Sequence, residues 1–112
     1  MTLKELYATL DLVLPKRVTY GVEQYDGDGN PEPPYICYQE TSKRTFEHRD
    51  DGPLFHSTKI QITLVTKRKD VSLETKLENA LDGAGLPWSL LREYRNGDET
   101  VSRAYETSME DF

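Results

Sequence analysis

Lys59-Ile60-Gln61-Ile62-Thr63-Leu64-Val65-Thr66 is the most strongly patterned stretch of this sequence. Apolar and polar residues alternate along it up to Leu64, and successive side chains of a β-strand point to opposite faces. The apolar face would carry Ile60, Ile62 and Leu64, and the polar face Lys59, Gln61 and Thr63. We expect the central strand of an antiparallel sheet. Val65 interrupts the alternation, so this end is either covered on both faces or turns into the next element.

Two amphipathic helices are predicted to cover the apolar face of that sheet. The first begins at Thr2, because Thr2 and Glu5 have the spacing of a capping box, and it ends at Pro15. Its apolar stripe consists of Leu3, Leu6, Tyr7, Leu10, Val13 and Leu14. The second follows the central strand and is capped by Asp70 or Ser72. Its stripe consists of Leu73, Leu77, Ala80, Leu81 and Ala84, and Gly83 and Gly85 stop it.

The remaining strands are predicted on both sides of the central one. Arg17–Val22 is β-favouring and short, as an edge strand would be, and Gln24–Pro34 is a loop rich in glycine, proline and aspartate. Tyr35–Glu40 pairs with the central strand in a long hairpin whose polar tip is Thr41–Phe55. The apolar residues of that tip are Phe46, Leu54 and Phe55, which either contact another chain or fold back onto the sheet.

A second hairpin closes the chain. Trp88–Tyr94 is its first strand, Asn96-Gly97 is a turn signal, and the returning strand places Val101, Tyr105 and Met109 on one face. The predicted fold is therefore one α+β domain, residues 1–112, in the order α-β-β-β-α-β-β. Two helices pack on one face of a four- to five-stranded, mainly antiparallel sheet.

Composition excludes several function classes. The 112 residues carry a net charge of −6, which repels phosphate backbones and anionic lipid. A single cysteine forms no internal disulfide, no apolar run marks a signal peptide, and no stretch of about 18 apolar residues spans a membrane. We expect an intracellular protein. Hydrophobic residues make up 36% of the chain, which suits an ordinary polar small domain and also a subunit completed by partners.

The sequence contains no complete catalytic or metal-binding pattern. Asp26–Asn30 matches the start of a calcium loop, but Pro31 stands where glycine is needed and Cys37 where glutamate is needed. His48 and His56 have no ligand-like spacing to each other or to that cysteine. We therefore expect no enzyme, no metal and no cofactor, with Cys37 acting as a small apolar residue in the sheet.

Five segments together resemble small prophage proteins of Gram-positive bacteria that are encoded among head and tail genes. They are the amphipathic start Thr2–Leu14, the strand Pro33-Pro34-Tyr35-Ile36-Cys37-Tyr38, the junction Ile62–Asp70, the helix core Leu77-Glu78-Asn79-Ala80-Leu81 and the closing Tyr105–Met109. Within this class the chain is most similar to tail terminator, or tail completion, proteins of long-tailed phages. The loop 26–32, Trp88 and Leu90-Leu91 have no counterpart in the pattern.

The resemblance implies a structural role in the virion, at the head–tail junction, after assembly in the host bacterial cytoplasm. Such proteins form a small ring, commonly a hexamer, that caps the tail tube and meets the head connector proteins. DNA passes through the lumen without specific binding, and an acidic lumen would suit that passage. The candidate contacts with a neighbouring subunit or the tube are Phe46, Leu54, Phe55, Lys59, Gln61 and Thr63. The alternative is a small prophage-encoded adaptor or inhibitor that binds one host protein through the same hairpin.

Overall fold

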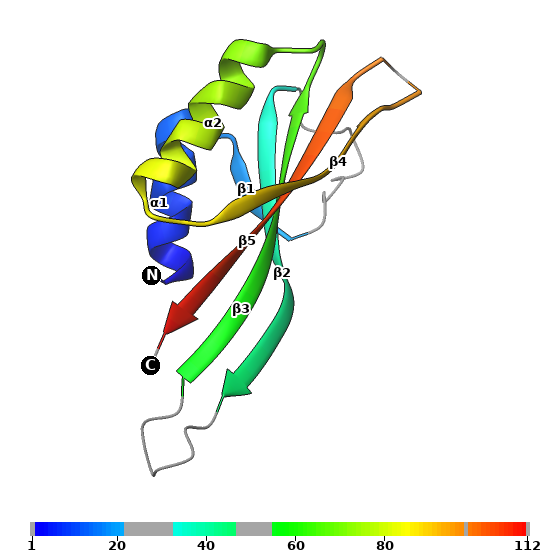
Figure 1. Cartoon of the computed structure of the whole chain (residues 1–112). Helices are drawn as coiled ribbons and strands as arrows, with labels where there is room; N and C mark the ends of the chain where they lie inside the picture. Colours follow the sequence, from blue (N-terminus) through cyan, green and yellow to red (C-terminus); the bar gives the residue numbers. More distant parts are fainter. Residues whose placement is uncertain (1, 22–32, 47–54, 98, 112) are drawn as a thin grey trace.

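The computed structural model describes residues 2–21, 33–46, 55–97 and 99–111, with only the backbone at 45–46, 55–56 and 110–111. The elements, in chain order, are α1 (Leu3–Val13), β1 (Val18–Tyr20), β2 (Tyr35–Phe46), β3 (Phe55–Thr66), α2 (Val71–Gly83), β4 (Trp88–Arg95) and β5 (Val101–Asp111). The five strands form one sheet in the order β1-β2-β3-β5-β4, and both helices lie on the same face (Figure 1). The predicted fold class and element order are confirmed.

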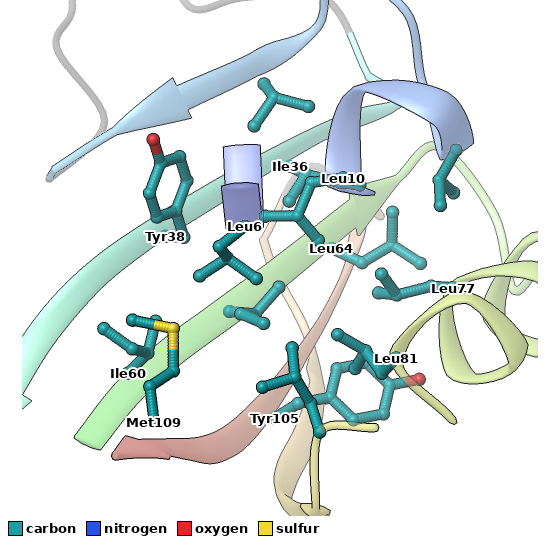
Figure 2. Close-up of a cluster of buried hydrophobic side chains, with 14 residues drawn as sticks. Leu6, Leu10, Ile36, Tyr38, Ile60, Leu64, Leu77, Leu81, Tyr105 and Met109 are labelled. Atoms are coloured by element: carbon teal, nitrogen blue, oxygen red, sulfur yellow. The ribbon is translucent and has the colours of Figure 1, made fainter. Parts of the chain in front are cut away.

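β3 is the central strand, as the alternation predicted, and its apolar face is the centre of the core. Ile60 and Ile62 have no exposed surface, and Leu64 is 1% exposed. The side chains that cover them come from both helices and from β5, as Figure 2 shows: Leu6, Leu10, Leu77, Leu81, Tyr105 and Met109. Burial of these side chains is the main force that holds the helices on the sheet.

The helix ends also follow the sequence. The Thr2 hydroxyl accepts the Glu5 backbone N–H at 3.2 Å, so α1 starts where the capping spacing placed it. At the start of α2 the cap is Asp70, whose carboxylate accepts the Leu73 N–H at 3.1 Å, and Ser72 lies inside the helix. After α2, Gly85 takes a φ of 73°, the left-handed conformation that favours glycine at a helix end.

β1 pairs with β2 in parallel, Val18 opposite Ile36 and Tyr20 opposite Tyr38, and it is the shortest strand of an otherwise antiparallel sheet. Parallel neighbours need a crossover of about a dozen residues or more, and segment 21–34 is long enough. Residues 24–32 of the predicted loop Gln24–Pro34 lie outside the described residues.

The long hairpin has longer arms than predicted. β2 continues from Glu40 to Phe46 and β3 begins at Phe55, so residues 42–46 and 55 of the predicted tip Thr41–Phe55 belong to a paired ladder, and residues 47–54 lie outside the described part of the chain. An irregularity between Glu40 and Ser42 shifts the register, which fits an extra residue in β2. Polar residues continue the ladder because two strands can pair through their backbones without an apolar face. At this end β2 and β3 extend past the helices (Figure 1). We call the outer end of their ladder, residues 44–46 and 55–57, the arm.

The closing hairpin is confirmed. β4 runs from Trp88 to Arg95 and pairs antiparallel with β5, with a register shift between Leu90 and Arg92. Val101, Tyr105 and Met109 are buried, and Tyr105 and Met109 join the main core. The Trp88 ring packs edge-on against Tyr105 at 5.4 Å between centroids, which ties the start of β4 to the core.

Candidate functional site

The sheet face opposite the helices carries three of the residues predicted as contacts. Lys59, Gln61 and Thr63 follow one another along the middle of this helix-free face. Lys59 is exposed, and Gln61 and Thr63 are half-buried. Gln39 and Glu106 lie opposite Gln61 on the neighbouring strands, so polar side chains form a row across the sheet.

These polar side chains are only weakly tied to one another. The Gln61 amide donates to the Thr63 hydroxyl at 3.4 Å, and the Lys59 ammonium lies 3.9 Å from the Glu106 carboxylate. Exposed ion pairs of this kind contribute little to folding. The middle of the helix-free face therefore retains donors and acceptors that a neighbouring molecule can bind.

One end of the same face is apolar and buried. Tyr35, Cys37 and Val65 form a small second cluster, so the end of β3 is covered on both faces, one of the two outcomes predicted for Val65. Cys37 is 8% exposed, and the Thr19 hydroxyl donates to its sulfur at 3.6 Å. The expectation that this cysteine lies in the sheet as a small buried residue is confirmed.

The predicted apolar tip residues lie elsewhere. Phe46 and Phe55 are opposite each other at the end of the β2–β3 ladder, several residues along the arm from Gln61. Their side chains and all of Leu54 fall outside the described residues. Of the predicted contact set, Lys59, Gln61 and Thr63 therefore lie on the helix-free face, and the backbone of Phe46 and Phe55 lies at the end of the arm.

β4 adds an exposed apolar surface that the sequence reasoning did not select. Leu90, Leu91 and Tyr94 are 44%, 47% and 48% exposed, and the Arg92 guanidinium lies 5.9 Å from the Tyr94 ring centre. β4 is the last strand of the sheet, so no described strand pairs with its outer side. The exposed fractions in the structure reveal these three apolar side chains on a free edge, whereas the periodicity of the sequence does not.

A network of charged groups joins α2 to β4 and β5 on the helix side of the sheet. Arg103 is at its centre: its guanidinium lies 3.0 Å from Glu93, 3.2 Å from Glu78 and 3.6 Å from Glu74. The Lys69 ammonium contacts Glu74 at 2.8 Å and Glu93 at 2.6 Å. The Tyr105 hydroxyl accepts a hydrogen bond from Arg103 and donates one to Glu78, each at 2.6 Å.

The charges of this network shift the pKa values of its members. Burial, and then the hydrogen bond to Glu78, raise the pKa of the Tyr105 hydroxyl above its ordinary 10.0. The Lys69 ammonium, followed by the Arg103 guanidinium, holds the pKa of Glu93 below its ordinary 4.5. Hydrogen bonds to Glu74 and then to Glu93 raise the pKa of Lys69. At neutral pH Tyr105 therefore keeps its proton, and the Glu93 carboxylate and the Lys69 ammonium keep their charges.

Two shallow hollows are present in the described part of the chain. One, of about 240 Å³, lies beside the start of β4 and is lined by Lys59, Trp88 and Glu106 among others. The other, of about 420 Å³, lies at the start of α2 beside Thr66, Lys67 and Arg68. Within residues 2–21, 33–46, 55–97 and 99–111, no group of histidine, cysteine, aspartate or glutamate side chains has the arrangement of a metal site. No helix there is long and apolar enough to cross a membrane.

Neither a protein-family model nor a curated protein matches this sequence. Among solved structures, the chain is similar to one from "Virion of native gene transfer agent (GTA) particle". The TM-score is 0.47 at 13% identity, over 95% of this chain and 92% of that one. A likeness of this size assigns no role to this chain.

Proposed function

We propose that this protein is a virion structural protein that acts in tail completion: it caps the tail tube and joins it to the head connector. The observation that carries the proposal is the split between a helix-covered core face and a polar helix-free face, built from the segments that resemble tail terminator proteins. The strand 35–38 pairs with the start of the junction 62–70 at one end of that face, and Leu77 and Leu81 hold α2 on the other side of the sheet.

The geometry suits assembly better than catalysis. The helix-free face presents Lys59, Gln61 and Thr63 on a rigid central strand, and the arm extends beyond the helices where a neighbour can reach it. The charged groups with shifted pKa values are engaged with one another across α2, β4 and β5. We therefore propose a non-enzymatic role, with a second copy, the tail-tube protein and the head connector as partners.

A tube-growth assay tests this role. Tail-tube protein from the same prophage is allowed to polymerise with and without this protein, and tube length is measured in electron micrographs. We expect added protein to shorten the tubes and to sediment with them. Unchanged tube length and no co-sedimentation would reject the proposal and favour an adaptor that binds a host protein.

A matched pair of variants locates the contact. Thr63→Lys places a long cation on the helix-free face at a half-buried position, and Leu12→Lys places the same cation on the outer side of α1, where Leu12 is 78% exposed. We expect the Thr63 variant to lose co-sedimentation with tubes and the Leu12 variant to keep it. Circular dichroism spectra of both variants serve as the folding control. The reverse result would place the contact on the helix side.

A further inference from the structure

The turn between β4 and β5 contains Asn96-Gly97, yet its shape does not depend on the conformational freedom of the glycine. Tight hairpins favour this pair because both of its residues adopt a positive φ. In this turn the left-handed residue is Glu99, with a φ of 71°, and Gly97 lies outside that region. A Cβ added to Gly97 would meet nothing within 4 Å. Neither backbone conformation nor space therefore requires glycine at this position.

Glycine after asparagine has a chemical consequence instead. Because Gly97 has no side chain, its backbone nitrogen can approach the Asn96 side-chain carbon with little hindrance, and this approach is the first step of asparagine deamidation. Gly97 is exposed, and its N–H has no hydrogen-bond partner among the described residues. Of the three asparagines in the sequence, Asn96 alone precedes glycine. The attacking nitrogen is therefore accessible at this one asparagine.

Two hydroxyl groups hold the Asn96 side chain. Its amide nitrogen donates to the Thr100 hydroxyl at 2.8 Å and to the Ser102 hydroxyl at 2.9 Å. Asn96 is half-buried and Ser102 is 4% exposed, so water competes only weakly for these hydrogen bonds. Both bonds fix the nitrogen that deamidation must release.

We propose that Asn96 is a site of spontaneous deamidation, and that the hydroxyls of Thr100 and Ser102 restrain its rate. The Gly97 nitrogen forms a bond to Asn96 Cγ and gives up its proton, while the Cγ–Nδ2 bond breaks and the nitrogen leaves as ammonia. Water then opens the succinimide ring at either carbonyl, which yields aspartate or isoaspartate with no oxidant or reductant. This inference is independent of the proposed tail-completion role.

The two products differ in their effect on the turn. In isoaspartate the main chain runs through Cβ and Cγ, so it gains one carbon between positions 96 and 97. The former backbone carbonyl of Asn96, which accepts the Glu99 N–H at 3.0 Å, becomes a free carboxylate. Aspartate keeps the main chain, and the Thr100 and Ser102 hydroxyls can donate to its carboxylate. We therefore expect isoaspartate to loosen the end of the closing hairpin and aspartate to preserve it.

A comparison of folded and unfolded protein measures the restraint. The full chain is incubated at mildly alkaline pH, either folded or unfolded in urea, and peptide mapping follows the mass gain at residue 96. We expect the folded chain to react about ten times more slowly, because two hydrogen bonds must break before the ring closes. Folded protein with both Thr100→Val and Ser102→Ala should react within about twofold of the unfolded rate, and Thr100→Val alone should be intermediate.

Gly97→Ala is the matched control, because the turn has room for a Cβ at this position and does not require a positive φ. It should keep the fold, as circular dichroism would show, and should nearly abolish the mass gain in both the folded and the unfolded chain.

Three results would overturn the inference. Equal rates in folded and unfolded wild-type protein would show that the folded turn does not restrain the reaction. An unchanged rate in the double variant would show that the two hydroxyls are not the restraint. Absence of the mass gain in the unfolded chain would show that Asn96 is not a reactive site.

Discussion

At the scale of single residues, Arg103 makes the largest number of distinct polar contacts described here. Its side chain is 16% exposed and contacts carboxylates from both α2 and β4 together with the Tyr105 hydroxyl. Desolvation penalises a buried charge, and several partners offset that penalty only together. Removing the guanidinium would leave Glu74, itself 5% exposed, with a single described cation, Lys69.

Arg103→Met should therefore be strongly destabilising. We expect a loss of about 2–4 kcal/mol in the free energy of unfolding, measured by urea denaturation at neutral pH. Lys69→Met is the matched control: its side chain is 43% exposed, so the expected loss is about 1 kcal/mol or less. Equal losses in the two variants would show that the network does not depend on the arginine.

Glu93 gives this network a dependence on pH. Because its folded-state pKa lies below the ordinary 4.5, its contribution to stability is present above that pH and is lost as the pH falls through the folded-state value. Glu93→Gln should thus lower the urea midpoint at pH 7, and the difference from wild type should shrink at pH 3. A difference that stays constant between the two pH values would argue that Glu93 is not stabilised by Lys69 and Arg103.

Sequence periodicity did not reveal this network, for a physical reason. Arg103 contacts Glu78 across 25 positions of sequence, and Lys69 contacts Glu93 across 24. Such pairs depend on how α2 lies over β4 and β5, which local patterns do not specify. By contrast, the burial of Tyr105 followed from alternation within its own strand.

At the scale of elements, α1 shows how far a helical stripe predicts burial. Leu6, Leu10 and Val13 are buried as expected, whereas Tyr7, assigned to the same stripe, is 41% exposed and packs at its edge against Tyr38, 6.5 Å between ring centres. The difference lies in angle: Tyr7 points about 100° around the helix from Leu6. The apolar spacing therefore predicted the buried centre of the stripe correctly, but the predicted stripe was wider than the buried one.

Two leucines on α1 make this argument quantitative. Leu10 has no exposed surface, and Leu12 is 78% exposed. Leu10→Ala should cost about 3–5 kcal/mol through lost burial and a residual cavity, while Leu12→Ala should change stability by about 0.5 kcal/mol or less. Thermal and urea unfolding measure both. Similar losses would mean that α1 does not pack on the sheet through its Leu6–Leu10 face.

The strands show which parts of the sheet a sequence can predict. β3 and the helix-facing side of β5 follow from alternation, because one face of each is buried. The parallel direction of β1 and the outer half of β2 do not follow. β1 contributes only Val18–Tyr20, too few residues for a pattern, and beyond Glu40 the hairpin is held by its backbone ladder rather than by an apolar face.

At the scale of the whole molecule, the sheet has one face covered by the helices, the helix-free face opposite it, and two edges that differ in length. The sequence predicted the first two through Ile60, Ile62 and Leu64 on one side of β3 and Lys59, Gln61 and Thr63 on the other. The edges depend on where β1 and β4 end, so only the structure reveals them. The proposed tail-completion role leaves the helix-free face for the tube, the connector or the lumen.

Negative-stain microscopy of the purified protein mixed with purified tail tubes tests this account most directly. We predict a ring at one end of each tube, with the other end bare, because a terminator binds the growing end alone. Protein that stays monomeric and leaves both tube ends bare would contradict the account.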